Sequence, residues 1–244
     1  MNYGRSQIQV PPLTKVNKII IISVVSTFLI QAVLKATLDI NLGIYLGLSG
    51  MMVGKGFLHQ IFTYSFVGTS LFEVLFDGLI LWFIGADLES LWGARRYIYY
   101  LTSAALGGGV IFLLVQYLFF NGGPYFAFPL TGPGGICYAL LMAYAILFPN
   151  RILYMIIFPI KAKWFCVILL GIQLYLGFFS GGKVLFWGHL GAMFSGFIFM
   201  IIVSNPEIKN YLSKKKKKLK KKDRSHLSLV KEDDDDDDSP KYWH

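Results

Sequence analysis

Charge is scarce over long stretches of this sequence. Of its 244 residues, 55% are hydrophobic and 15% are charged, whereas about a quarter are charged in an average soluble domain. Several uncharged stretches approach the roughly 20 residues that a helix needs to cross a bilayer. Lipid offers no partners for free backbone groups, so such stretches form helices. The sequence therefore predicts an all-α polytopic membrane protein and argues against a soluble domain.

Three other features are missing. The segment before the first apolar run is polar and has no small-residue cleavage site, so we expect no cleaved signal peptide. The two cysteines, Cys137 and Cys166, both fall in apolar runs, where thiols behave as small apolar groups, so we expect no disulfide. No histidine pair with metal-ligand spacing occurs, so we expect no metal and no cofactor.

Six apolar runs are predicted to be spans. They cover residues 19–38, 71–88, 97–120, 135–148, 164–179 and 184–203. We therefore expect a cytoplasmic segment at 1–18, a membrane domain at 19–203 and a disordered cytoplasmic tail at 204–244. The loop between the first two runs is long, apolar and rich in glycine, which favours an interfacial or re-entrant element.

Basic residues indicate the orientation. One set of connections carries Arg5, Lys15, Lys18, Arg95, Arg96, Arg151, Lys161 and Lys163, followed by the lysine-rich tail, and the opposite set carries only Lys35, Lys55 and Lys183. By the positive-inside rule, both termini are cytoplasmic. Short loops without an accessory domain favour a bacterial inner-membrane protein.

The tail holds two blocks of opposite charge. A basic block, Lys214–Lys222, is followed by the acidic run Glu232–Asp238, and blocks of like charge stay disordered. A basic block close to the last span attracts anionic lipid headgroups. Nucleic-acid binding is not expected, because no aromatic residues are interleaved for base stacking.

Small residues recur at four-residue spacing in two of the predicted spans. Gly135 and Ala139 form a ridge in the fourth, and Gly188, Ala192 and Gly196 form another in the sixth. Such faces let helix backbones approach closely in lipid, so these two spans are expected to touch. The contact would bring Gly134 near His189, with Tyr138 one turn on and able to stack on the imidazole.

Ionisable residues at membrane depth are costly and indicate function. Glu73 and Asp77 lie four residues apart on one helical face, and His189 opens the sixth span. Together they suggest a water-accessible cavity among the second, fourth and sixth spans. A metal site or a proton path from these residues would need further ligands or charges, which the spans do not supply.

Several separated motifs resemble the rhomboid family of intramembrane serine proteases. They are "HQIFTYSFVGTSLFEVLFDGLILWFIGADLESLWGARRYIYYL", "GPGGICYALLMAYAILFPN", "FPIKAKW" and "GHLGAMFSGF", in the order and spacing of that family, from about Leu48 to Val203. The resemblance implies a rhomboid-like bundle of six transmembrane helices. It also implies a serine nucleophile at the start of the fourth span, a histidine base in the sixth, and a His and an Asn in the second that help to form the oxyanion hole.

When the family pattern is aligned with this chain, the histidine base is present and the serine nucleophile is absent. His189 matches the base, Tyr138 matches the aromatic that stacks on it, and Gly134 stands at the serine. Glu73 and Asp77 replace the oxyanion donors and would repel the charge that they should stabilise. We therefore expect a pseudoprotease that binds the transmembrane segment of a client without cutting it.

Two alternatives remain at this point. One is an active intramembrane endopeptidase that uses an activated water or a displaced nucleophile such as Cys137. The other is a channel or transporter built on Glu73, Asp77 and His189, for which the fold offers no second gated access.

Overall fold

The computed structural model describes residues 12–155, 158–179 and 184–204. The chain divides into two units, residues 1–201 and 202–244, of which the second lies almost wholly outside the described residues. Most of the predicted N-terminal segment and of the predicted tail, including the basic and acidic blocks, also lies outside the described residues. The described residues belong to the first unit, apart from 202–204.

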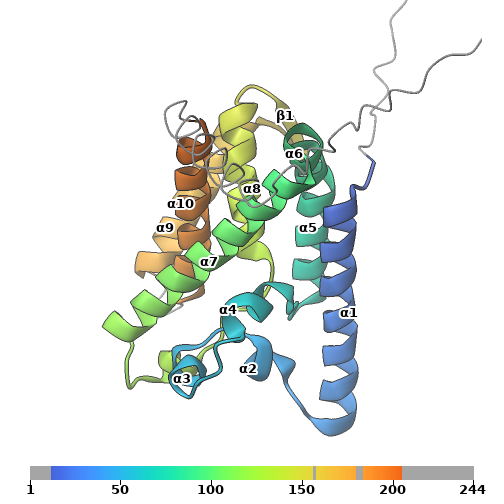
Figure 1. Ribbon diagram of the computed structural model, residues 1–244. Coiled ribbons are helices and arrows are strands. Elements are labelled where there is room, and N and C mark those ends of the chain that lie inside the picture. The colour runs from blue at the N-terminus through green and yellow to red at the C-terminus, as the bar shows by residue number, and fades with distance from the viewer. Residues whose placement is uncertain (1–11, 156–157, 180–183, 205–244) are drawn as a thin grey trace, which may run out of the picture. The chain divides into compact units, whose positions relative to one another are not determined.

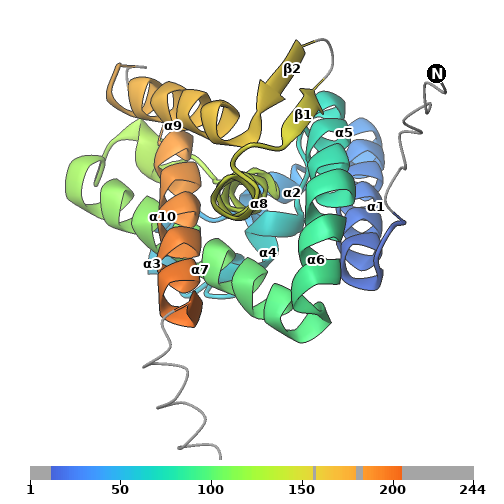
Figure 2. The ribbon, with the colours of Figure 1, turned by 90° about the horizontal axis from the view of Figure 1, so that it is seen from above.

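Long helices dominate the described residues (Figure 1). They are α1 (Lys15–Leu38), α7 (Ala94–Phe119), α9 (Ala162–Phe179), α10 (Leu185–Ser204) and the run α5 (Leu71–Ile80), η2 (Leu81–Gly85) and α6 (Ala86–Trp92), in which η2 is a π-helical turn. Figure 2 shows the shorter α8 (Gly134–Leu147) in the middle, with the long helices around it. This arrangement agrees with the expected all-α membrane protein.

The number of spans is smaller than expected. Among the described residues, α1, α7, α9 and α10 are long and apolar enough to cross a membrane, and the bent pair Gln60–Phe66 and Leu71–Trp92 gives a fifth candidate. Helix α8, where the fourth span was predicted, has 14 residues, or about 21 Å of helix against the roughly 30 Å of a hydrocarbon core. The length of α8 is why four or five candidate spans stand where six were expected.

The predicted loop between the fourth and fifth apolar runs contains a β-hairpin. Strands β1 (Ile152–Met155) and β2 (Phe158–Lys161) pair antiparallel, with Ile152 opposite Lys161 and Leu153 opposite Ile160. Leu153 packs against the main apolar core. No element was expected in this segment, although a short run of apolar residues that includes Ile152, Leu153 and Ile160 suits a strand.

The glycine-rich first loop folds into short helices: α2 (Leu42–Leu46), α3 (Gly50–Gly54), α4 (Gln60–Thr63) and η1 (Tyr64–Phe66), with η3 (Pro124–Ala127) beside them from the next loop on the same side. Two buried glutamines tie the backbone together. Gln60 Oε1 accepts from Ser49 N, and Gln116 Oε1 accepts from Gly50 N. The loop is therefore an ordered element, held by hydrogen bonds of glutamine side chains that are buried from solvent.

Basic connections gather at one end of the helices. The first turn of α1, the α6–α7 turn and the hairpin lie at the same end in Figure 1, and α2, α3 and α4 lie at the other. These are the connections that carry most of the basic residues, which is the two-sided distribution used to predict cytoplasmic termini. The side of the membrane stays a prediction.

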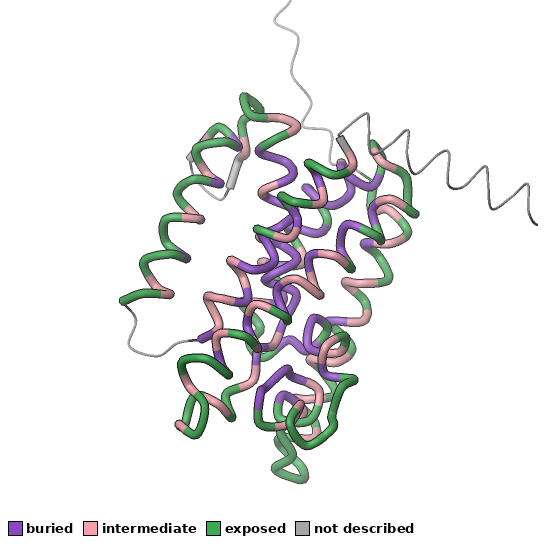
Figure 3. The backbone as a smooth tube through the Cα atoms, turned by 60° about the vertical axis from the view of Figure 1, so that its left-hand side comes forward, coloured by how far each residue is buried: buried purple, intermediate pink, exposed green. Residues whose placement is uncertain are grey.

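Burial differs sharply between helices, with buried residues concentrated in the interior of the helical unit (Figure 3). Helix α8 buries most of its residues, whereas α1 buries only Asn17 and Val24. Large apolar side chains on α1, α9 and the outer face of α5 are exposed, as expected of helix faces that contact lipid. Cohesion in lipid therefore depends on close packing between helices.

Candidate functional site

The start of α8 is held from outside by the first loop. Leu130 and Leu48 exchange backbone hydrogen bonds of 2.8 and 2.9 Å, and Gly132 N donates to Tyr64 O at 2.9 Å. Gly132 has a φ of +88°, which strongly favours glycine. A Cβ at that position would also collide with the Glu73 carboxylate. These contacts fix the point at which Gly134 enters the bundle.

His189 on α10 faces Gly134. A Cβ built on Gly134 would lie 3.3 Å from His189 Nε2. On the other side of the ring, His189 Nδ1 lies 3.2 Å from the buried Gln173 Oε1 on α9. A carbonyl oxygen only accepts, so Nδ1 carries the proton of the neutral ring and Nε2 directs its lone pair toward Gly134.

Tyr138 stacks on the imidazole of His189. The ring centroids are 4.9 Å apart and the planes are inclined by 28°. Phe186 meets the same imidazole edge-on, with centroids 6.4 Å apart. With Gln173 holding Nδ1, the ring is fixed both in orientation and in tautomer, as a base requires.

Small residues bring α8 and α10 together. A Cβ on Gly135 would lie 3.3 Å from Ala192 Cβ, and one on Gly196 would lie 3.2 Å from Ala139 Cβ. Gly188 packs instead against Leu130, in the segment that leads into α8, with its built Cβ 2.7 Å from Leu130 Cδ2. Larger side chains at these positions would separate the helices, and His189 would move away from Gly134.

The two carboxylates on α5 differ in their surroundings. Asp77 is 7% exposed, and its buried Oδ2 has no hydrogen-bond partner among the residues that the structure describes. That oxygen would lie 3.8 Å from a Cβ on Gly134. Glu73 is partly exposed and accepts a hydrogen bond from Thr69 Oγ1 at 2.8 Å. The structure thus brings Asp77 and His189 to one point over Gly134, with Glu73 beside Gly132.

Cys137 does not join this group. It is 1% exposed, and its Sγ donates to the backbone oxygen of Asp77 at 3.6 Å. The thiol is therefore directed at the α5 backbone.

The described residues contain no cluster of three or more histidine, cysteine, aspartate or glutamate side chains suited to a metal ion.

Two features were missed in the sequence. Gln173 is a polar residue in an otherwise apolar run, and that contrast could have marked it as a partner of a polar group. The second feature is a buried network in which Glu89 accepts from Val16 N at 3.2 Å, Asn17 N at 3.3 Å and Asn17 Nδ2 at 3.1 Å, and Tyr97 donates to Asn17 Oδ1 at 2.7 Å. These partners are far apart in sequence, and no local pattern joins them.

The helices and this buried polar site define a polytopic integral membrane protein. The family model described as "Eukaryotic integral membrane protein (DUF1751)" matches residues 18–210, and the chain belongs to that family. The family is described as eukaryotic, so the expected bacterial inner-membrane location is wrong. The features behind that expectation, short loops without an accessory domain, do not distinguish bacterial from eukaryotic membrane proteins. Among curated proteins none matches the chain.

Proposed function

We propose that this protein is a rhomboid-fold pseudoprotease that binds the transmembrane segments of client membrane proteins without cutting them. The observation that carries the proposal is the position of Gly134. The group that would act as base faces it, with Nε2 3.3 Å from where its Cβ would be. A serine there would have its hydroxyl within reach of that nitrogen, whereas glycine offers no atom to attack a peptide bond.

The surroundings of Gly134 support binding and argue against catalysis. The imidazole keeps its stacking partner Tyr138 and its hydrogen bond to Gln173. The oxyanion side carries Asp77 and Glu73, and a carboxylate opposes the negative charge that develops on a carbonyl oxygen. The framework for holding a peptide near α8 is therefore retained, while the chemistry has no nucleophile and an unfavourable electrostatic environment.

A client would reach α8 from the side. Helices α5 and α9 both pack against α8 and share little contact with each other, and they lie on different sides of it in Figure 2. The outer face of α5 carries exposed apolar residues such as Phe72, Leu75 and Leu79. A transmembrane helix placed against that face would exchange lipid contacts for protein contacts, which costs little in a bilayer. In this proposal, α8 completes a six-helix rhomboid-like bundle.

The basic block of the tail, Lys214–Lys222, would bind anionic lipid on the cytoplasmic surface. A fluorophore attached after this block should be quenched by lipid-borne quenchers in vesicles that contain phosphatidylserine. Neutral vesicles, or glutamines in place of these lysines, should abolish the quenching. Equal quenching in neutral vesicles would refute electrostatic tethering.

The test of the main proposal is reconstitution in liposomes with labelled transmembrane reporters, scoring cleavage and photocrosslinking in parallel. We expect reporters to crosslink near Gly134 and to remain intact. Cleavage that disappears in a His189→Ala variant would overturn the proposal and identify an endopeptidase with an activated water or a displaced nucleophile. Absence of both signals would overturn client binding.

A further inference from the structure

The point over Gly134 has the geometry of a receptor for a single positively charged nitrogen. An atom at the Cβ position of Gly134 would be 3.3 Å from His189 Nε2 and 3.8 Å from Asp77 Oδ2. A bound donor nitrogen would lie beyond that Cβ position, clear of the α8 backbone, and would approach both atoms to hydrogen-bond distance there. Two acceptors on the side of Gly134 that carries no side chain call for a group with several protons.

Asp77 lacks the partner that its burial demands. It is 7% exposed and its Oδ2 makes no hydrogen bond, whether to His189 or to any other described group. A buried carboxylate without a partner is costly and rare. The two ion pairs among the described residues, Lys35–Asp39 and Arg151–Asp87, leave Asp77 and Glu73 without a cation. The missing partner therefore comes from outside this part of the chain.

Local charge favours a cation at this point. The uncapped N-terminus of α8 contributes about half a positive charge, which stabilises one carboxylate but does not balance two. Glu73, beside Gly132, accepts only a neutral hydroxyl proton from Thr69. An anionic ligand would meet both carboxylates, and a neutral one would leave Asp77 without a counter-charge.

We propose that the emptied site binds the side-chain ammonium of a lysine in the client's transmembrane segment, held by Asp77 Oδ2 and His189 Nε2 with Glu73 nearby. This inference rests on the proposed client-binding function. An ammonium is a compact charge with three donors that can point to separate acceptors. A guanidinium is a planar fork that matches the two oxygens of one carboxylate, whereas here the acceptors come from α5 and α10. Lysine is therefore preferred to arginine.

A membrane lysine also gives the client a reason to bind. A lone ammonium at membrane depth is expensive and is usually satisfied by a partner. Since α8 has only 14 residues, the proposal places its first turn below the membrane surface. A client whose lysine lies at the depth of Gly134 would exchange an unfavourable lipid environment for two buried acceptors.

The test uses the full chain in nanodiscs and four synthetic transmembrane peptides that differ at one position: lysine, arginine, norleucine or glutamate. Each peptide carries a photoreactive leucine next to that position, so the protein itself is not altered. The yield of crosslinked product against peptide concentration gives an apparent affinity. Norleucine is the matched control, because it keeps the apolar stem of lysine and removes the charge.

We expect the lysine peptide to bind at least about tenfold more tightly than the norleucine peptide, the lower end of the coupling between close charge pairs. Arginine should lie between them, and glutamate should bind most weakly. Asp77→Asn should bring the lysine-to-norleucine ratio close to one, and Glu73→Gln should reduce it less. Asp39→Asn, at an exposed carboxylate outside the site, should leave the ratio unchanged.

The outcomes separate the two proposals. If all peptides crosslink with equal affinity, client binding stands and the lysine inference falls. If no peptide crosslinks, both fall. A lysine preference that survives Asp77→Asn and Glu73→Gln also overturns the inference, because the ammonium then binds elsewhere. Should Asp77→Asn not fold, as judged by size-exclusion chromatography, Glu73→Gln decides alone.

Discussion

Glu89 and Asp77 lie on the same helical run, and both are almost fully buried, at 6% and 7% exposure. The Glu89 carboxylate accepts from two backbone amides at the start of α1 and from the Asn17 side chain. The Asp77 Oδ2 accepts no hydrogen bond from any described residue. A buried charge without partners is more destabilising than one with satisfied hydrogen bonds. In our proposal, this difference separates a carboxylate that serves the fold from one that binds a ligand.

The largest effect is expected from Glu89→Gln. The amide keeps the size of the side chain but replaces one of the two carboxylate oxygens with an NH2 group. That donor would face the backbone N–H of Val16 or of Asn17, each of which now donates to a carboxylate oxygen. It also removes a negative charge from the positive end of α1. We expect a loss of about 2 kcal/mol in the free energy of unfolding, measured by SDS titration in mixed micelles. No loss would mean that the network contributes nothing net to stability.

Asp77→Asn should act in the opposite direction. The amide replaces a buried carboxyl group whose Oδ2 has no partner among the described residues, so we expect a gain of up to about 1 kcal/mol in the same titration. The sign is what matters, because a substitution at a residue built into the fold would destabilise. A loss comparable to that of Glu89→Gln would show that Asp77 has a structural partner after all.

Gly134→Ser tests whether the carboxylates of Glu73 and Asp77 block the chemistry of a restored nucleophile. The added Cβ would lie 3.3 Å from His189 Nε2, a close contact that a shift of a few tenths of an ångström relieves, so we expect a loss of about 0.5 kcal/mol in the free energy of unfolding. The single variant should not react with a fluorophosphonate probe, because two carboxylates still flank the site. Each missing oxyanion donor costs about 100- to 1,000-fold in rate.

Combining Gly134→Ser with Glu73→His and Asp77→Asn should restore labelling, and adding His189→Ala should abolish it. Labelling of the single variant would show that the carboxylates do not block the chemistry. Failure of the triple variant, when correctly folded, would count against a retained hydrolase framework.

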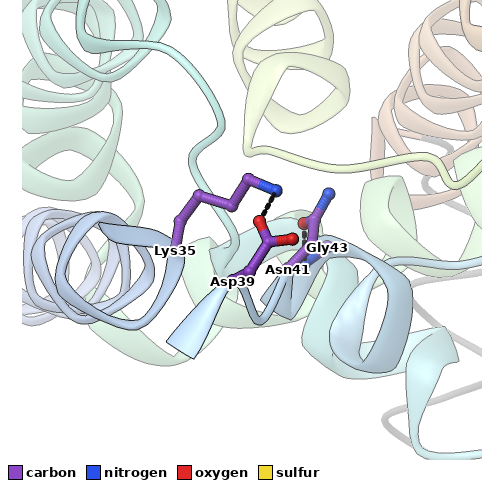
Figure 4. Close-up of polar contacts among 4 residues, drawn as sticks. All are labelled: Lys35, Asp39, Asn41 and Gly43. Atoms are coloured by element: carbon purple, nitrogen blue, oxygen red, sulfur yellow. Dashed lines mark hydrogen bonds and ion pairs between the residues drawn. The ribbon is translucent and has the colours of Figure 1, made fainter. Parts of the chain in front are cut away.

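The smallest effect is expected at the exposed end of α1, where Lys35 contacts Asp39 and Asn41 accepts from Gly43 N (Figure 4). The hydrogen bond and the charge of Lys35 lower the pKa of Asp39 below its ordinary 3.8. Any contribution to stability is therefore present above about pH 4 and is lost as the pH falls through the lower folded value. Asp39→Asn should remove this acid-side dependence and leave neutral stability nearly unchanged, as thermal unfolding at several pH values and salt concentrations can show.

Most of the long helices could be predicted because their apolar runs are long and the borders carry glycine, proline or charge. The approach of Gly134 to His189 could be predicted because small residues at four-residue spacing indicate which helix faces touch. The partners of Glu89 could not, since a carboxylate at a helix end is compatible with water, lipid headgroups or a neighbouring helix. The short helices of the first loop also lack a local signal, because Gln60 and Gln116 hold them from a distance.

The contrast between α8 and α1 also bears on how the family can diverge. Most residues of α1 are not buried by protein, and contact with lipid requires an apolar side chain but not a particular shape. A residue of α8 has protein on nearly every side, where Gly135 and Ala139 leave no room for a larger neighbour. Over evolutionary time the first helix should therefore drift freely among apolar residues, while the central one keeps the size of each side chain.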